Sequence, residues 1–187
     1  MRPLQSRWAR IGPTDRRWLS HVPPGGVCIS AFLIVRNRRG DLLLGRPRGH
    51  PDWPEKGCYP LWRLREVAKE GRWILPASHF QMDESPAHAA RRIASIWAGI
   101  SRATPRLVTV ESEVFSLGRR MGSGRFRHRL THWALCFIYE VVTDETPRKR
   151  AAWAELKFVP ERELRRVRFG RDHRDIYRRY QAHRRER

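Results

Sequence analysis

Apolar positions along the chain fall into strand-like runs separated by turns. Residues 27–35 (VCISAFLIV) are rich in β-branched and aromatic side chains, which is typical of a buried strand. The turn NRRGD and the run LLLG at 42–45 predict that this strand returns as a hairpin. Further strands are predicted at 107–117, 131–142 and 155–159, together with a short strand at 73–75 stopped by Pro76.

Helical spacing is clearest after residue 85. Pro86 suits a first helical position, and Gly99 suits a helix end. Between them, apolar side chains recur three and four residues apart at Ala89, Ala90, Ile93, Ile96, Trp97 and Ile100. Helices are also expected at 61–70 and from Pro160 to about Arg166. The order of strands, helix, strands and helix predicts an α/β fold with a mixed sheet.

This order resembles the Nudix hydrolase-like family over about residues 25–168. The family signature is a loop–helix–loop: Gly, five residues, Glu, seven residues, Arg-Glu, an aliphatic residue, any residue, Glu-Glu, any residue, Gly and an aliphatic residue. Glu84 falls on its first glutamate and Arg92 on its arginine, and Gly99-Ile100 falls on its closing pair, without a gap. The resemblance implies a Nudix-like α/β/α sandwich with the loop–helix–loop at about 76–100.

The same resemblance predicts how the chain is organised. Residues 1–24 are basic and contain prolines, and we expect a basic N-terminal arm there. Residues 25–168 would form the Nudix-like domain, with an insertion at 46–72 that is longer than the family usually has. Residues 169–187 would form a strongly basic C-terminal helix or tail.

The departures from the signature concern its carboxylates. The opening glycine falls on Ser78, and the three later glutamates fall on Ile93, Ile96 and Trp97. In active members these carboxylates hold a divalent cation against a diphosphate, and a hard cation needs several oxygen ligands. Residues 85–110 contain no Asp or Glu, so no shift of register restores the ligands. We therefore expect a degenerate signature with no metal bound on this helix.

Carboxylates elsewhere leave a second possibility open. Glu84, Glu111, Glu113 and Glu155 could rebuild a relocated site that uses Mg²⁺ or Mn²⁺. The chain would then be a divergent hydrolase of nucleoside diphosphate derivatives or capped RNA. The simpler alternatives are that Glu84 interacts with the helix N-terminus, and that Glu111 and Glu113 face solvent or pair with arginine. Whether the protein is an enzyme stays open at this point.

Charge changes the expected partner. The net charge is +20, and only four of the 39 basic residues are lysines, which leaves 35 arginines. Arginine presents a planar fork to phosphate and stacks on bases, so nucleic acid is the favoured partner, with RNA or a ribonucleoprotein first. GC-rich coding or a thermophilic preference for arginine would also explain the composition.

Two segments concentrate this charge. The first is a predicted glycine- and arginine-rich loop at 118–130, and the second is the C-terminal segment. Arginine among aromatic residues and a flexible backbone is typical of contacts to phosphates and bases. The candidate nucleic-acid contacts are Arg119, Arg120, Arg125, Arg127, Arg129, Arg174, Arg178 and Arg179.

The leading hypothesis is a Nudix-like protein without hydrolase activity that binds nucleic acid through these surfaces. A further hypothesis is a protein-binding module in which Ile93, Ile96 and Trp97 form an exposed apolar patch. Three cysteines at wide spacing indicate neither a zinc site nor a disulfide framework. No apolar run approaches membrane-spanning length and no secretory signal is evident, so we expect a cytoplasmic protein without membrane contact. The ligand and the oligomeric state are not determined by the sequence.

Overall fold

The computed structural model describes residues 27–48, 61–81, 84–121, 128–170 and 173–186, with only the backbone described at 27–28, 61–63, 113–121 and 128–133. The expected N-terminal arm, residues 49–60 of the insertion and the tip between the two long strands lie outside these residues. No helix in the described ranges is long and apolar enough to cross a membrane.

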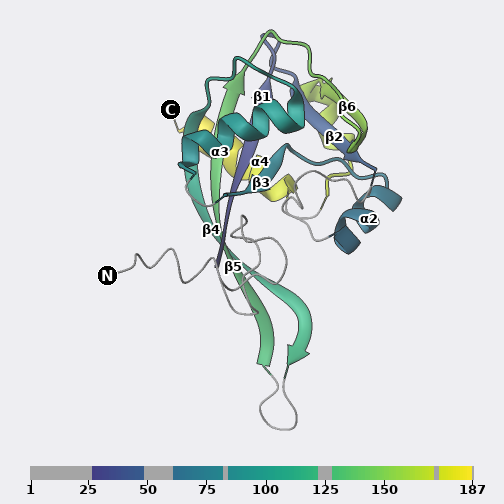
Figure 1. Cartoon of the computed structure of the whole chain (residues 1–187), viewed down its shortest axis with the longest axis vertical. Coiled ribbons are helices and arrows are strands. Elements are labelled where there is room, and N and C mark those ends of the chain that lie inside the picture. Colours follow the sequence, from purple (N-terminus) through teal and green to yellow (C-terminus); the bar gives the residue numbers. More distant parts are fainter. Residues whose placement is uncertain (1–26, 49–60, 82–83, 122–127, 171–172, 187) are drawn as a thin grey trace.

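A mixed six-stranded sheet forms the centre of the fold (Figure 1). Five strands follow one another in the order β4, β5, β1, β2 and β6, while β3 pairs with β1 off this path. Strands β1 and β5 run parallel and the remaining pairs are antiparallel, which confirms the predicted mixed sheet. The bounds are β1 Val27–Arg36, β2 Leu42–Pro47, β3 Ala77–His79, β4 Arg106–Met121, β5 His128–Val142 and β6 Trp153–Val159.

Strand β1 divides one of its edges between two partners. Its end pairs with β2 at Arg36↔Leu42, and its middle pairs with β3. The predicted strand at 73–75 is wrong, because Trp73 and Ile74 form only isolated bridges and the strand lies beyond Pro76. Proline has no N–H to donate, but the Pro76 carbonyl accepts a 2.9 Å hydrogen bond from the Leu33 amide. The proline therefore sits within the pairing without breaking it.

The pair β4 and β5 is longer than expected. The predicted loop at 118–130 is wrong over much of its length, because β4 continues to Met121 and β5 begins at His128, with Arg120 opposite Arg129. The ladder is made by main-chain groups, so arginine side chains do not prevent it. Figure 1 shows this part of the hairpin projecting away from the sheet and its helices.

Helices cover both faces of the sheet, as the sandwich requires (Figure 1). Helix α3 (Pro86–Ile93) and its π-helical continuation η1 (Ala94–Ala98) lie over one face. The 3₁₀ helix η3 (Glu161–Arg166) and helix α4 (His173–Arg185) lie over the other. Helix α2 (Leu61–Lys69) ends before Gly71, where the sequence predicts an end. The α/β/α sandwich predicted from the sequence is therefore confirmed.

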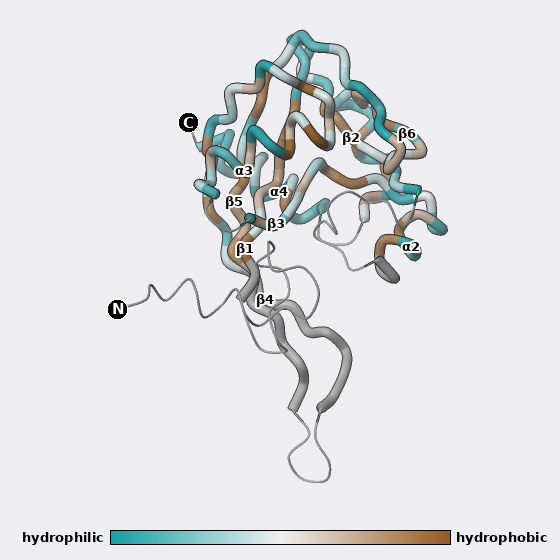
Figure 2. Tube along the Cα trace, viewed as in Figure 1, coloured by the Kyte–Doolittle hydropathy of each residue, from teal (hydrophilic) through white to brown (hydrophobic). Residues whose placement is uncertain are grey.

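The alternation of side chains along β1 explains why there are two cores. Ala31, Leu33 and Val35 point into the core under α3, while Phe32 and Ile34 point into the core under α4. All five are buried. A strand that is covered on both faces has no polar side, which is why 27–35 reads as a continuous apolar run. In Figure 2 the hydrophobic positions accordingly gather along the inner strands.

Candidate functional site: helix α3 and an arginine-lined groove

Helix α3 begins as the sequence predicts. Ser85 has extended backbone, and its side chain accepts a hydrogen bond from the His88 amide, while Pro86 follows in the first helical position. The side-chain cap is supplied by Ser85 and not by Glu84. The Glu84 carboxylate instead faces Arg92, two turns further along.

Glu84 and Arg92 form a bidentate pair with little exposure to solvent. The Arg92 Nε and Nη2 atoms donate to the two carboxylate oxygens at 2.6 and 2.8 Å, and the side chains are 14% and 9% exposed for Arg92 and Glu84. Glu84 also accepts from the Gln81 amide, and Arg92 also donates to the His79 carbonyl. These bonds hold the loop before α3 against the helix. They also engage the carboxylate of Glu84, the residue that aligns with the first glutamate of the Nudix signature.

The other three positions of the signature are apolar and covered. Ile93 and Trp97 are 0% and 1% exposed, and Ile96 is half-buried against the same core. The Trp97 ring meets Trp153 of β6 edge to face at 5.3 Å. The chain's own residues thus cover this face, so the hypothesis of an exposed apolar patch at these three residues is wrong.

The end of the helix is tightly enclosed. Gly99 has φ 67°, and the Arg148 amide donates to the Ala98 carbonyl at 2.9 Å. A Cβ on Gly99 would lie 2.6 Å from the Arg148 Cβ, so both the backbone conformation and the packing require glycine here. The loop that follows β5 therefore lies directly on the end of η1.

The candidate carboxylates Glu111 and Glu155 each have basic partners. Glu111 on β4 accepts from Arg179 at 2.6 Å and lies 3.0 Å from His183 Nε2. Burial acts to raise the pKa of Glu111, but hydrogen bonds from Arg179, Thr109 and His183 outweigh it, so this pKa is lowered. On β6, Glu155 pairs with Arg46 and Lys157.

The described residues contain no group of three or more His, Cys, Asp or Glu side chains that could hold a metal ion. The side chain of Glu113 lies outside the described part. The structure therefore does not bring Glu84, Glu111 and Glu155 together into one site.

Two of the candidate arginines on α4 help to hold this helix in place. Arg174 donates to the Val167 carbonyl and lies over the Phe169 ring, and Arg179 pairs with Glu111. Arg178 is exposed, and among the described residues its ion-pair partner is Asp175, one turn away. The side chains of Arg119, Arg120, Arg125, Arg127 and Arg129 lie outside the described residues, so their predicted role remains a prediction.

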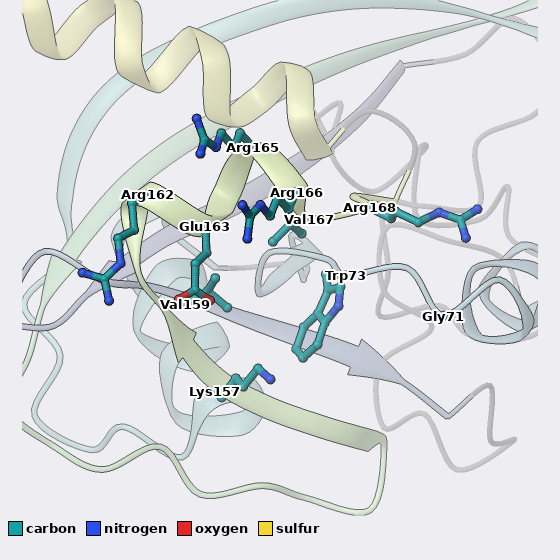
Figure 3. A pocket seen from close by; sticks show the side chains of 10 residues that line it. All are labelled: Gly71, Trp73, Lys157, Val159, Arg162, Glu163, Arg165, Arg166, Val167 and Arg168. Atoms are coloured by element: carbon teal, nitrogen blue, oxygen red, sulfur yellow. The ribbon is translucent and has the colours of Figure 1, made fainter.

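A groove that the sequence did not predict lies beside η3 (Figure 3). It has a volume of about 540 Å³ and adjoins a second hollow of about 550 Å³, with which it shares residues 165–168. The first hollow is lined by Gly71, Trp73, Lys157, Val159, Arg162, Glu163, Arg165, Arg166, Val167 and Arg168. The second adds Arg72, Phe169, Gly170, Arg174 and Asp175. We call the two together the η3 groove.

The tertiary structure assembles the η3 groove from three parts of the chain. Trp73 bridges to Phe169, Lys157 belongs to β6, and the arginines belong to η3 and the segment after it. The run of arginines at 162–168 was visible in the sequence. Its position beside Trp73 and Lys157 was not, because residues 73 and 168 are far apart in the sequence. Main-chain hydrogen bonds bring them together: the Trp73 amide donates to the Arg168 carbonyl, and the Gly170 amide donates to the Trp73 carbonyl.

The solved structures of similar fold include MutT and Nudix proteins. The MutT protein from Methanosarcina mazei Go1 superposes with a TM-score of 0.59 at 17% identity, covering 86% of this chain and 97% of that one. The protein has the Nudix fold. The NUDIX domain of Shewanella oneidensis NrtR, complexed with ADP ribose, gives a TM-score of 0.53 at 13% identity over 80% of this chain and 82% of that one. A C. elegans Ap4A hydrolase superposes with a TM-score of 0.51 at 14% identity, covering 83% of this chain and 96% of that one.

Neither a protein-family model nor a curated protein sequence matches the chain. At these identities the Nudix comparison establishes the fold alone. The chemistry of the Nudix-fold chain must therefore be argued from its own residues.

Proposed function

We propose that this Nudix-fold protein has lost hydrolase activity and binds nucleic acid or a ribonucleoprotein through arginine-rich surfaces. The observation that carries the proposal is the burial of Ile93 and Trp97 in the core under α3. Aliphatic and aromatic side chains cannot ligate a divalent cation, and a diphosphate is poorly attacked without one.

The charge supports the binding part of the proposal. The chain carries a net charge of +20, and arginine recognises phosphate through paired N–H donors. Arg178 on α4 is exposed, and its pair with Asp175 is a surface pair of little strength. Such arginines can exchange a weak carboxylate contact for a phosphate contact.

The proposal is tested by titrating the purified full-length chain into a fluorescently labelled single-stranded RNA and following anisotropy at several salt concentrations. We expect binding at low salt. The logarithm of the binding constant should fall linearly with the logarithm of the salt concentration, with a slope of roughly −0.7 for each phosphate neutralised on a single strand. Absence of binding to RNA and DNA at low salt would contradict the proposal.

A divergent hydrolase is the second candidate. It is favoured by one observation, the retained Glu84–Arg92 pair, which matches two positions of the signature. The test is incubation with nucleoside diphosphate derivatives and capped RNA in Mg²⁺ or Mn²⁺, followed by analysis of the released nucleotides. We expect no metal-dependent release. If release occurs and Glu111→Gln or Glu155→Gln abolishes it, the chain is an enzyme with a relocated site.

A further inference from the structure

The η3 groove is lined by exposed arginine side chains. Arg162, Arg165, Arg166 and Arg168 are all exposed. None of the four forms an ion pair or side-chain hydrogen bond with any residue that the structure describes. Among the described residues that line the two hollows, two are acidic, Glu163 and Asp175, against seven basic ones.

Some arginines elsewhere in the described part are held by carboxylates, while others, such as Arg65 and Arg91, are exposed on the open surface. Arg36, Arg46 and Arg92 each meet a carboxylate, and all three are at least partly buried. The four η3 arginines instead leave their guanidinium groups in a hollow surface. Four like charges on one short stretch of the chain repel one another, and an anion bound among them would offset this repulsion.

The shape of the η3 groove favours an extended anion. The two hollows share Arg165, Arg166 and Arg168, so the basic lining continues from Lys157 on β6 to Arg174 on α4. A single phosphate would fill only a small part of two hollows of about 540 and 550 Å³. A chain of phosphates would reach the arginines along the whole length.

An aromatic side chain lines the same groove. Trp73 is half-buried, and Figure 3 shows its ring among Lys157, Arg166 and Val167. The Lys157 Nζ lies 5.0 Å from the centre of the Trp73 ring. Lys157 is 54% exposed, so its ammonium can follow a phosphate while a base takes its place on the ring. Base stacking on an aromatic ring beside a basic track is a common way to bind single strands.

We infer that the η3 groove binds single-stranded nucleic acid, with phosphates on Arg162, Arg165, Arg166 and Arg168 and a base against Trp73. This inference rests on the proposed function and names its site and its ligand. A single strand is required because the bases of a duplex are stacked on one another and cannot present a face to Trp73.

The experiment compares two triple variants that lose the same charge. Arg165→Gln/Arg166→Gln/Arg168→Gln removes three charges from the η3 groove. Arg148→Gln/Lys149→Gln/Arg150→Gln removes three from the exposed loop before β6. Binding of a labelled oligouridine and of a duplex of equal charge is measured against salt, after circular dichroism confirms that each variant is folded. We expect the groove variant to lower the salt slope for oligouridine by about two, which is three contacts at roughly 0.7 each.

A second pair of variants tests the base contact. Trp73→Ala should weaken binding of oligouridine about fivefold or more without changing the salt slope, because stacking involves no counterion release. Trp73→Phe should restore most of the affinity, since it keeps an aromatic face.

The outcomes separate the two proposals. If the wild-type chain binds no single strand at low salt, the proposed function fails and the inference fails with it. If the wild type binds but the groove and loop triples change the slope equally, the proposed function stands and the η3 groove is not the site. Equal affinity for the duplex would overturn the assignment to single strands.

Discussion

The indole Nε1 of Trp153 donates a 2.8 Å hydrogen bond to the main-chain carbonyl of Trp97. Trp153 lies on β6 and Trp97 lies in the last turn of η1, so the bond joins the edge of the sheet to the end of the signature helix. Both side chains are 1% exposed. The part of the fold that the resemblance associates with metal ligation is here a packed aromatic contact, and this contact leads to the first prediction.

Placing glutamate back on this helix should destabilise the protein instead of creating a metal site. Ile93→Glu would bury a carboxylate at a fully covered position, and we expect the free energy of unfolding to fall by more than about 3 kcal/mol. Ile96→Glu is the matched control: this position is half-buried, so the charge can reach water and the loss should be about 1 kcal/mol. Urea unfolding measures both. Equal losses at the two positions would contradict the burial difference.

The Glu84–Arg92 pair should contribute to stability as a unit. Removing one partner leaves the other charge in a nearly dry place, so Glu84→Gln should cost about 3 kcal/mol. A double-mutant cycle with Arg92→Gln should give a coupling of about 1–3 kcal/mol. The Arg38–Asp144 pair is the control, because its side chains are 80% and 59% exposed and exposed pairs couple by less than about 1 kcal/mol. A coupling no larger than that of this surface pair would show that the buried pair is dispensable.

Two glycines with left-handed backbone should respond differently to alanine. Gly71 has φ 63°, and no atom of the described residues lies within 4 Å of the place that an alanine Cβ would take, so Gly71→Ala should cost only the backbone strain, about 1 kcal/mol. Gly99 has φ 67° and the additional contact with Arg148, so Gly99→Ala should cost clearly more. Thermal unfolding of the two variants makes the comparison, and an equal loss would mean that the loop carrying Arg148 moves away freely.

Helix α4 should loosen at alkaline pH. Burial, with a smaller contribution from Glu161, raises the pKa of Tyr177 from 10.0 to about 12. The unfolded chain loses this proton first, so the stabilisation is complete below pH 10 and is lost as the pH rises towards 12. One such group contributes at most about 1.4 kcal/mol per pH unit.

Tyr177→Phe provides the comparison for this alkaline effect. Between pH 10 and 12, the free energy of unfolding of the variant should fall less steeply than that of the wild type. Below pH 10 the two slopes should agree. Parallel curves across the whole range would show that Tyr177 does not titrate in this way.

The sequence by itself determined the Nudix-like order of strands and helices, the start of α3 at Pro86 and the end of its continuation η1 at Gly99. These features follow from local chemistry, since apolar periodicity, a serine cap and a left-handed glycine act within a few residues. The sequence also shows directly that residues 85–110 contain no Asp or Glu, so the loss of the signature carboxylates could be predicted without the tertiary structure.

Only the tertiary structure decided where those side chains go and what they meet. Whether Ile93 and Trp97 are covered depends on β6, more than fifty residues away, and the contact of Trp97 with Trp153 has no local signal. The strand beyond Pro76 and the η3 groove were missed for the same reason. The Pro76 carbonyl is used by Leu33, and Trp73 meets Lys157 and the η3 arginines only after the sheet and its helices have packed.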